Sequence, residues 1–135
     1  MFPAVGRIGA LLATVVIMAL ASGSIGWAGS NDAKPSTISP EAQEAANSIF
    51  AERCAVCHGD DGAGAGPGAA NLNPKPQNFR SRKWQKAMTD HQIAMIIVNG
   101  GSSVGLSASM AANPDLEGQP DVVAALVERV RKFAK

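Results

Sequence analysis

The stretch Cys54-Ala55-Val56-Cys57-His58 contains both cysteines and one of the two histidines of this 135-residue chain. A helix start precedes it at Ser39-Pro40-Glu41, where a capping side chain, a first-turn proline and an acid occur in order. Apolar residues then recur at helical spacing as far as Phe50. We therefore expect the motif at the end of this helix. Residues three and four apart share a helix face, so Cys54, Cys57 and His58 should point the same way.

Two thiols at this spacing can form thioethers with the two vinyl groups of one porphyrin, and His58 can then ligate its iron. A thioredoxin-type dithiol requires a β-α-β setting, which this sequence lacks. A zinc site requires four ligands, and the other histidine is the isolated His91. A disulfide between Cys54 and Cys57 would leave His58 unexplained. The motif therefore predicts one covalently bound haem c.

The N-terminus has the layout of an export signal. Met1 to Arg7 carries one positive charge, Ile8 to Ala21 is almost entirely apolar, and Gly26 and Ala28 suit a cleavage site. We predict a signal peptide at residues 1–28 and a polar lead-in at residues 29–38. An uncleaved anchor is the alternative, because the apolar run approaches the ~20 residues that cross a bilayer. Either arrangement places the remaining domain, residues 39–135, outside the cytoplasm.

The rest of the chain predicts an all-α domain. A short helix is expected at residues 80–87, and a second begins at Thr89, with Gln92 completing a capping box and Gly100-Gly101 ending it. The last helix opens at Pro120. Long loops separate these three to four helices. Such loops are uncommon in a compact domain unless something organises them, and a haem would do so.

The charges are balanced, with 12 basic and 11 acidic residues. Nucleic-acid binding requires a clustered positive field, so this composition argues against it.

Several motifs follow one another in a fixed order along residues 40–133. They are Phe50, Cys54-x-x-Cys57-His58-Gly59, Gly66-Pro67, Asn73-Pro74-Lys75-Pro76-x-x-Phe79, Asn99-Gly100-Gly101 and Val104-Gly105-Leu106-Ser107-x-x-Met110. In this order of motifs, the chain resembles the class I monohaem c-type cytochromes of bacteria. The resemblance implies the cytochrome c fold, with the first and last helices crossing at a haem edge, and a periplasmic electron carrier that is not an enzyme.

The resemblance implies Met110 as the second axial ligand. The residues favour the same choice, because Met88 and Met95 fall at or within a predicted helix, whereas Met110 lies in a loop that can close over the haem. His91 is the rival ligand, and its alternative role is that of a solvated side chain.

The resemblance also implies that a proline supplies the carbonyl that orients His58. Pro67 is the best match and Pro74 the second. Phe79 and Trp84 are assigned to the haem surroundings. The cations around Trp84 have three possible roles: bonding a haem propionate, docking an acidic partner, or simply facing solvent. They are Arg80, Arg82, Lys83 and Lys86.

This chain departs from the family pattern at the helix crossing. Arg129 stands where the last helix often has an aromatic residue, and Ala46 stands where glycine is usual. Phe133 is a candidate replacement for the aromatic contact with Phe50.

The leading hypothesis is a soluble periplasmic carrier that exchanges electrons with an oxidase, a cytochrome complex or a periplasmic dehydrogenase. Membrane contact is expected only if the leader is uncleaved. The first alternative is a cytochrome subunit of a larger periplasmic or membrane oxidoreductase. The second is a haem-based sensor or peroxidase, which requires an open sixth coordination site.

Overall fold

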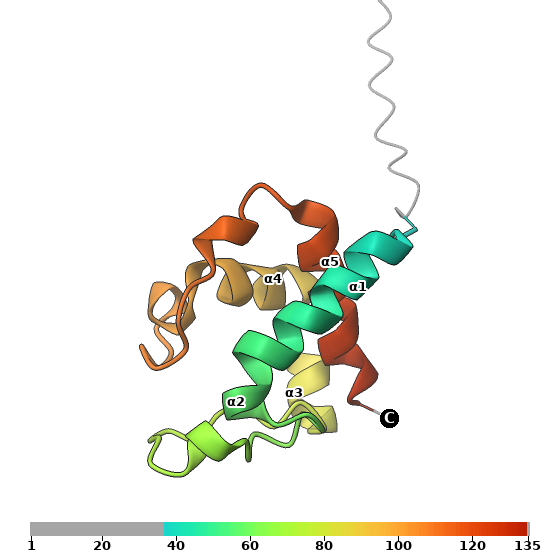
Figure 1. Cartoon of the computed structure of the whole chain (residues 1–135). Helices are drawn as coiled ribbons and strands as arrows, with labels where there is room; N and C mark the ends of the chain where they lie inside the picture. The colour runs from blue at the N-terminus through green and yellow to red at the C-terminus, as the bar shows by residue number, and fades with distance from the viewer. Residues whose placement is uncertain (1–36, 135) are drawn as a thin grey trace, which may run out of the picture. The chain divides into compact units, whose positions relative to one another are not determined.

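The computed structural model describes residues 37–134, and these form one helical unit (Figure 1). No strand occurs in this range, which confirms the all-α prediction. The predicted signal peptide and residues 29–36 of the lead-in lie outside the described residues. None of the helices in residues 37–134 is long and apolar enough to cross a membrane. The helices are α1 (Pro40–Ile49), α2 (Ala55–His58), α3 (Arg82–Ala87), α4 (Asp90–Asn99) and α5 (Pro120–Lys132).

Helix α1 begins as the sequence predicts. The Ser39 hydroxyl accepts a hydrogen bond from the Ala42 amide at 3.1 Å, and Pro40 occupies the first helical position. A π-helical turn at Phe50–Cys54 then joins α1 to α2. Helical backbone therefore continues from Pro40 to His58, and Gly59 ends it with φ at +77°. This wide turn ends at Cys54, the first thiol-bearing residue, and was not foreseen from the sequence.

Helix α4 also matches its predicted start and end. The Thr89 hydroxyl and the Gln92 side chain form both hydrogen bonds of a capping box. Gly100 follows the last residue with φ at +76°, which an L side chain rarely adopts. These local bonds fix where α4 ends, and with it where the loop that carries Met110 begins.

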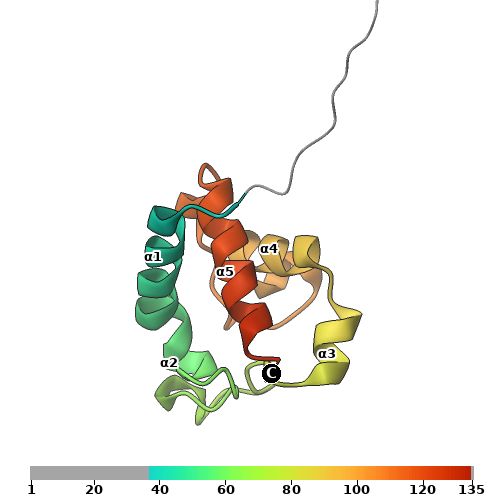
Figure 2. The ribbon, with the colours of Figure 1, turned by 90° about the vertical axis from the view of Figure 1, so that its right-hand side faces the viewer.

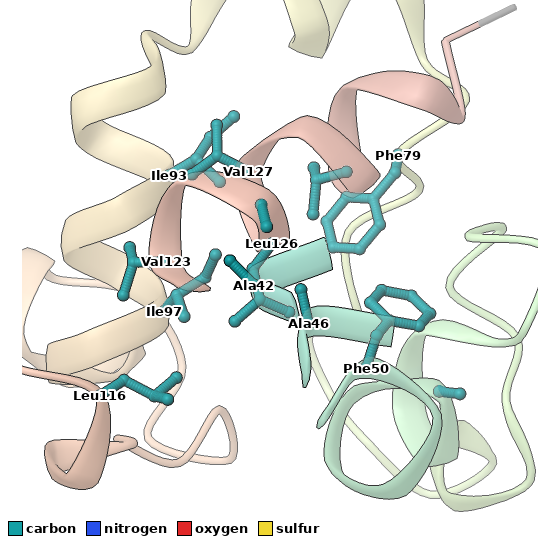
Figure 3. Packing of buried hydrophobic residues seen from close by; sticks show 13 residues of the cluster. Ala42, Ala46, Phe50, Phe79, Ile93, Ile97, Leu116, Val123, Leu126 and Val127 are labelled. Carbon is teal, nitrogen blue, oxygen red and sulfur yellow. The ribbon is translucent and has the colours of Figure 1, made fainter. Parts of the chain in front are cut away.

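The core lies where α1 packs against α5, as Figures 2 and 3 show. Ala46 and Ala125 are fully buried there, and Phe50 and Leu126 are each 1% exposed. Ala46 is small enough to let the two helices approach closely. Burying a side chain the size of Phe50 or Leu126 contributes about 1.5–3 kcal/mol. Helix α5 also packs against α4 through Val123 and Val127.

Phe133 supplies the aromatic contact that Arg129 does not. Its ring centroid lies 5.4 Å from that of Phe50. The Arg129 guanidinium carbon lies 4.4 Å from the Phe50 centroid, and Nη1 donates to Asn47 at 2.8 Å. The crossing thus combines an aromatic pair with a cation stacked on it, an arrangement that is favourable for a guanidinium.

Arg131 fastens α3 and the start of α4 to α5. Its guanidinium donates to the Gln85 backbone carbonyl at 2.7 Å, the Gln85 side-chain oxygen at 2.8 Å and the Met88 carbonyl at 2.6 Å. It also pairs with Asp90 at 2.8 Å. The sequence does not reveal these partners, because they lie more than forty residues away from Arg131.

We therefore predict that Arg131→Lys lowers the free energy of unfolding by about 1–2 kcal/mol, because an ammonium cannot reproduce the planar fork of donors. The measurement is chemical denaturation of the purified protein. The control is Lys132→Ala, which removes an exposed pair with Glu128 and should cost less than about 0.5 kcal/mol. Equal effects of the two variants would contradict the role assigned to Arg131.

Candidate haem site

The Cys54 thiol lies at the N-cap of α2, and the Cys57 thiol lies within the single turn of that helix. Both are free and partly exposed. Burial raises the pKa of the Cys54 thiol above its ordinary value, so this thiol is protonated at neutral pH. A Cβ built on Gly68 would lie 3.6 Å from the Cys57 sulfur, so the following loop packs directly on that side chain. The loop therefore contacts the Cys57 sulfur, whereas the Cys54 thiol donates to the Ile49 carbonyl at 3.9 Å.

His58 is the one buried polar or charged side chain in residues 37–134, with 7% of its surface exposed. Its Nδ1 lies 3.1 Å from the Gln77 backbone carbonyl. Because a carbonyl only accepts, Nδ1 carries the proton and Nε2 keeps a free lone pair. Burial lowers the pKa of His58, although the bond to Gln77 opposes this, and a lowered pKa favours the neutral imidazole. Such a ring is prepared to ligate a metal through Nε2.

The carbonyl that orients His58 corrects the prediction from the sequence. Neither Pro67 nor Pro74 faces Nδ1, and both prolines are exposed. Gln77 follows Pro76 and lies 19 residues beyond His58. Pro67 instead begins a short 3-10 turn, Pro67–Ala69, that packs on α2. The prolines therefore shape the loop, while the adjacent peptide supplies the acceptor.

The glycine-rich loop wraps the end of α2 through backbone hydrogen bonds. The Gly64 amide donates to the His58 carbonyl at 2.8 Å, and the Gly66 amide donates to the Cys57 carbonyl at 3.1 Å. A Cβ on Gly66 would collide with the Ala55 carbonyl oxygen. This approach therefore requires glycine. The loop satisfies helix-end carbonyls that would otherwise lack partners.

Phe79 is stacked on the imidazole of His58. The ring centroids are 4.3 Å apart and the planes differ by 13°. The Phe79 amide donates to the Gly62 carbonyl at 2.8 Å, which fixes the backbone at this point. Trp84 packs on Phe79, with its ring centroid 5.4 Å from that of Phe79 and the planes tilted by 39°. Phe79 therefore contacts His58 directly, whereas Trp84 acts on the site through Phe79.

Met110 lies beside the same cavity as His58 and Cys54. Its carbonyl accepts from the Gly101 amide at 3.0 Å, which ties its loop to the end of α4. The Asn113 side chain holds the loop again by donating to the Ile97 carbonyl at 2.8 Å. The cavity is lined by Phe50, Cys54, His58, Phe79, Ile97, Met110, Leu126 and Val130.

The other candidate ligands lie elsewhere. His91 is exposed in the first turn of α4 and, with Met95, lines a separate open groove between α4 and α5. Met95 is 41% exposed. Met88 packs against the core cluster but does not line the cavity that contains His58. Met110 is thus the only methionine of residues 37–134 that shares this cavity.

The chemistry of these side chains fits a covalent haem. Two free thiols flank a helix turn, a neutral imidazole presents Nε2, and a thioether lies on the same cavity. The remaining lining is apolar, as a porphyrin face requires. No cluster of three or more His, Cys, Asp or Glu residues in the described range offers a competing metal site.

Comparison with known proteins agrees with this chemistry. The family model described as Cytochrome c matches residues 43–124, which is more than half of the chain and includes most of α1, the Cys-x-x-Cys-His motif, α4 and the Met110 loop. No curated protein matches the chain. The helical fold, the thiol and imidazole geometry, and the extent of this match show that the chain belongs to the cytochrome c family.

Proposed function

We propose that the chain is an exported carrier of single electrons, with one haem attached through thioethers to Cys54 and Cys57. Membership of the family implies haem-based electron transfer. The proposal assigns the axial positions to Nε2 of His58 and the sulfur of Met110. The observation that carries it is the buried His58 ring, whose Nδ1–H is tied to Gln77 on a cavity that Met110 also lines.

When bound, the haem supplies an iron that gains or loses one electron. The residues around the haem would limit the structural change that accompanies the gain or loss of this electron. Gln77 and Phe79 fix the ring of His58, and the bond from Gly101 to the Met110 carbonyl holds the opposite loop. The apolar side chains that line the cavity would shield the bound group from water. Two protein ligands leave no open coordination position, which favours electron transfer over substrate chemistry.

The proposed location is the periplasm, with a signal peptide at residues 1–28. The support is the pattern of one basic residue, an apolar run and small residues at the N-terminus. A membrane-anchored form that faces the periplasm is the alternative. The proposed partners are redox proteins in that compartment, such as an oxidase, a cytochrome complex or a dehydrogenase.

The choice of Met110 predicts that Met110→Ala lowers the midpoint potential, because a thioether ligand stabilises ferrous iron. Spectroelectrochemical titration of the purified holoprotein measures this. Met95→Ala is the matched control, since Met95 is exposed on α4 and should leave the potential unchanged. An unchanged potential in the Met110 variant would rule out Met110 as a ligand.

A closed iron site also predicts that the reduced wild-type protein does not bind carbon monoxide at neutral pH, whereas the reduced Met110→Ala protein does. The reason is that removal of the thioether opens one coordination position. Difference spectra recorded with and without the gas provide the measurement. Rapid binding by the wild type would instead favour a sensor or a peroxidase.

A further inference from the structure

The basic residues are distributed unevenly along the chain. Residues 62–89 contain five Lys or Arg and no Asp or Glu. Within residues 37–134, the side chains of Arg82, Lys83 and Lys86 form no salt bridge or hydrogen bond, and all three are exposed on α3. Every other cation in that range has a polar partner. These pairs are Arg53 with Asp115, Lys75 with the Ala69 and Ala70 carbonyls, Arg80 with Asp61, Arg129 with Asn47, Arg131 with Asp90, and Lys132 with Glu128.

Hydrogen bonds of Gln85 hold α3 against the rest of the protein. The outer face of α3, which carries Arg82, Lys83 and Lys86, is exposed. Gln85 donates to the Phe79 carbonyl at 2.7 Å and to the Val130 carbonyl at 2.9 Å. The guanidinium of Arg131 donates to the side-chain oxygen of Gln85 at 2.8 Å. Figure 2 shows α3 at the side of the molecule, next to the C-terminal end of α5. The helix therefore presents its cations on a rigid support.

Trp84 connects this helix to the imidazole of His58 through aromatic contacts. Its ring lies 5.4 Å from that of Phe79. Phe79 lies 4.3 Å from His58 and nearly parallel to it. Electron tunnelling weakens steeply with distance and is stronger through closely packed atoms than across gaps. A row of packed rings from a surface helix to an iron ligand is therefore an efficient route.

We propose that the outer face of α3, formed by Arg82, Lys83 and Lys86, docks an acidic redox partner and that electrons pass between this face and His58 through Trp84 and Phe79. This inference rests on the proposed carrier function and adds the entry point and the charge of the partner. In each transfer the donor loses one electron and the haem iron gains it. No bond forms or breaks, and no proton moves.

The loop around Met110 contrasts with α3 in charge. Residues 99–114 contain no charged side chain and expose Val104 and Leu106, which are 44% and 57% exposed. In Figure 1 this loop, in orange, lies at the left, away from α3. An acidic partner gains no electrostatic attraction there. The two surfaces can therefore be distinguished by their response to charge and salt.

The first test is the rate at which hexacyanoferrate(III), a trivalent anion, oxidises the reduced holoprotein. In Lys83→Gln/Lys86→Gln, we expect the rate to fall by about tenfold at low ionic strength and the difference to disappear at high salt. Glutamine is as favourable in a helix as lysine, so α3 should remain intact.

The matched control places the same change in net charge on the other loop, as Ser102→Glu/Ala108→Glu. Both positions are exposed. We expect this variant to slow the reaction much less than the α3 variant. The proposed docking face is wrong if the control variant slows the oxidation more than the α3 variant does. It is also wrong if the α3 variant reacts as fast as the wild type.

A second readout does not depend on electron transfer. Hexacyanocobaltate(III) is a redox-inert trivalent anion. When it is added to the reduced, isotope-labelled holoprotein, it should shift the amide resonances of Arg82 to Lys86, and much less so in Lys83→Gln/Lys86→Gln. Shifts confined to residues 101–112 would overturn the assignment.

The route itself is tested with Trp84→Leu, which removes one ring. The hexacyanoferrate(III) rate should fall by more than any change in the midpoint potential of the same variant accounts for, while the salt dependence of the rate stays as in the wild type. An unchanged rate would remove Trp84 from the route. These results are separable from the carrier function, which would fail earlier if the wild-type protein showed no reversible one-electron couple.

Discussion

The hydrogen bond between Nδ1 of His58 and the Gln77 carbonyl is the interaction on which the rest of the site depends. It fixes the tautomer and the plane of the imidazole, and so it fixes where Nε2 points. To form it, the chain must return to α2 at Gln77, which lies 19 residues beyond His58. The glycines allow that loop to pack on the helix end, and the Phe79 amide locks its far end to Gly62. The irregular segment between His58 and Gln77 therefore serves to orient the imidazole of His58.

The crossing of α1 and α5 supplies the stable frame for this support. Phe50 belongs both to the crossing and to the cavity lining, so packing at the helix interface and packing at the site are shared. The replacement of an aromatic residue by Arg129 is accommodated because its guanidinium stacks on Phe50 and Phe133. Arg131, one helical turn from the core residue Val127, extends the same frame to α3.

The sequence predicted those features that local bonding determines. The caps at Ser39 and Thr89, the glycine after α4 and the placement of the motif at a helix end involve neighbours within a few residues. It failed for the partner of His58, because any carbonyl in a proline-rich loop could face Nδ1. The π-helical turn and the four bonds of Arg131 were also missed, since distant packing determines them. Met110 lines the same cavity as His58, and its ligation of the iron stays a prediction.

The central claim is that one haem is covalently bound through Cys54 and Cys57. It is tested most directly by the mass of the peptide that contains residues 54–58, from protein made in a host with haem-attachment machinery. We predict a peptide heavier by one haem, with neither cysteine available to a thiol-alkylating reagent. A peptide of unmodified mass, alkylated at both cysteines, would contradict the account.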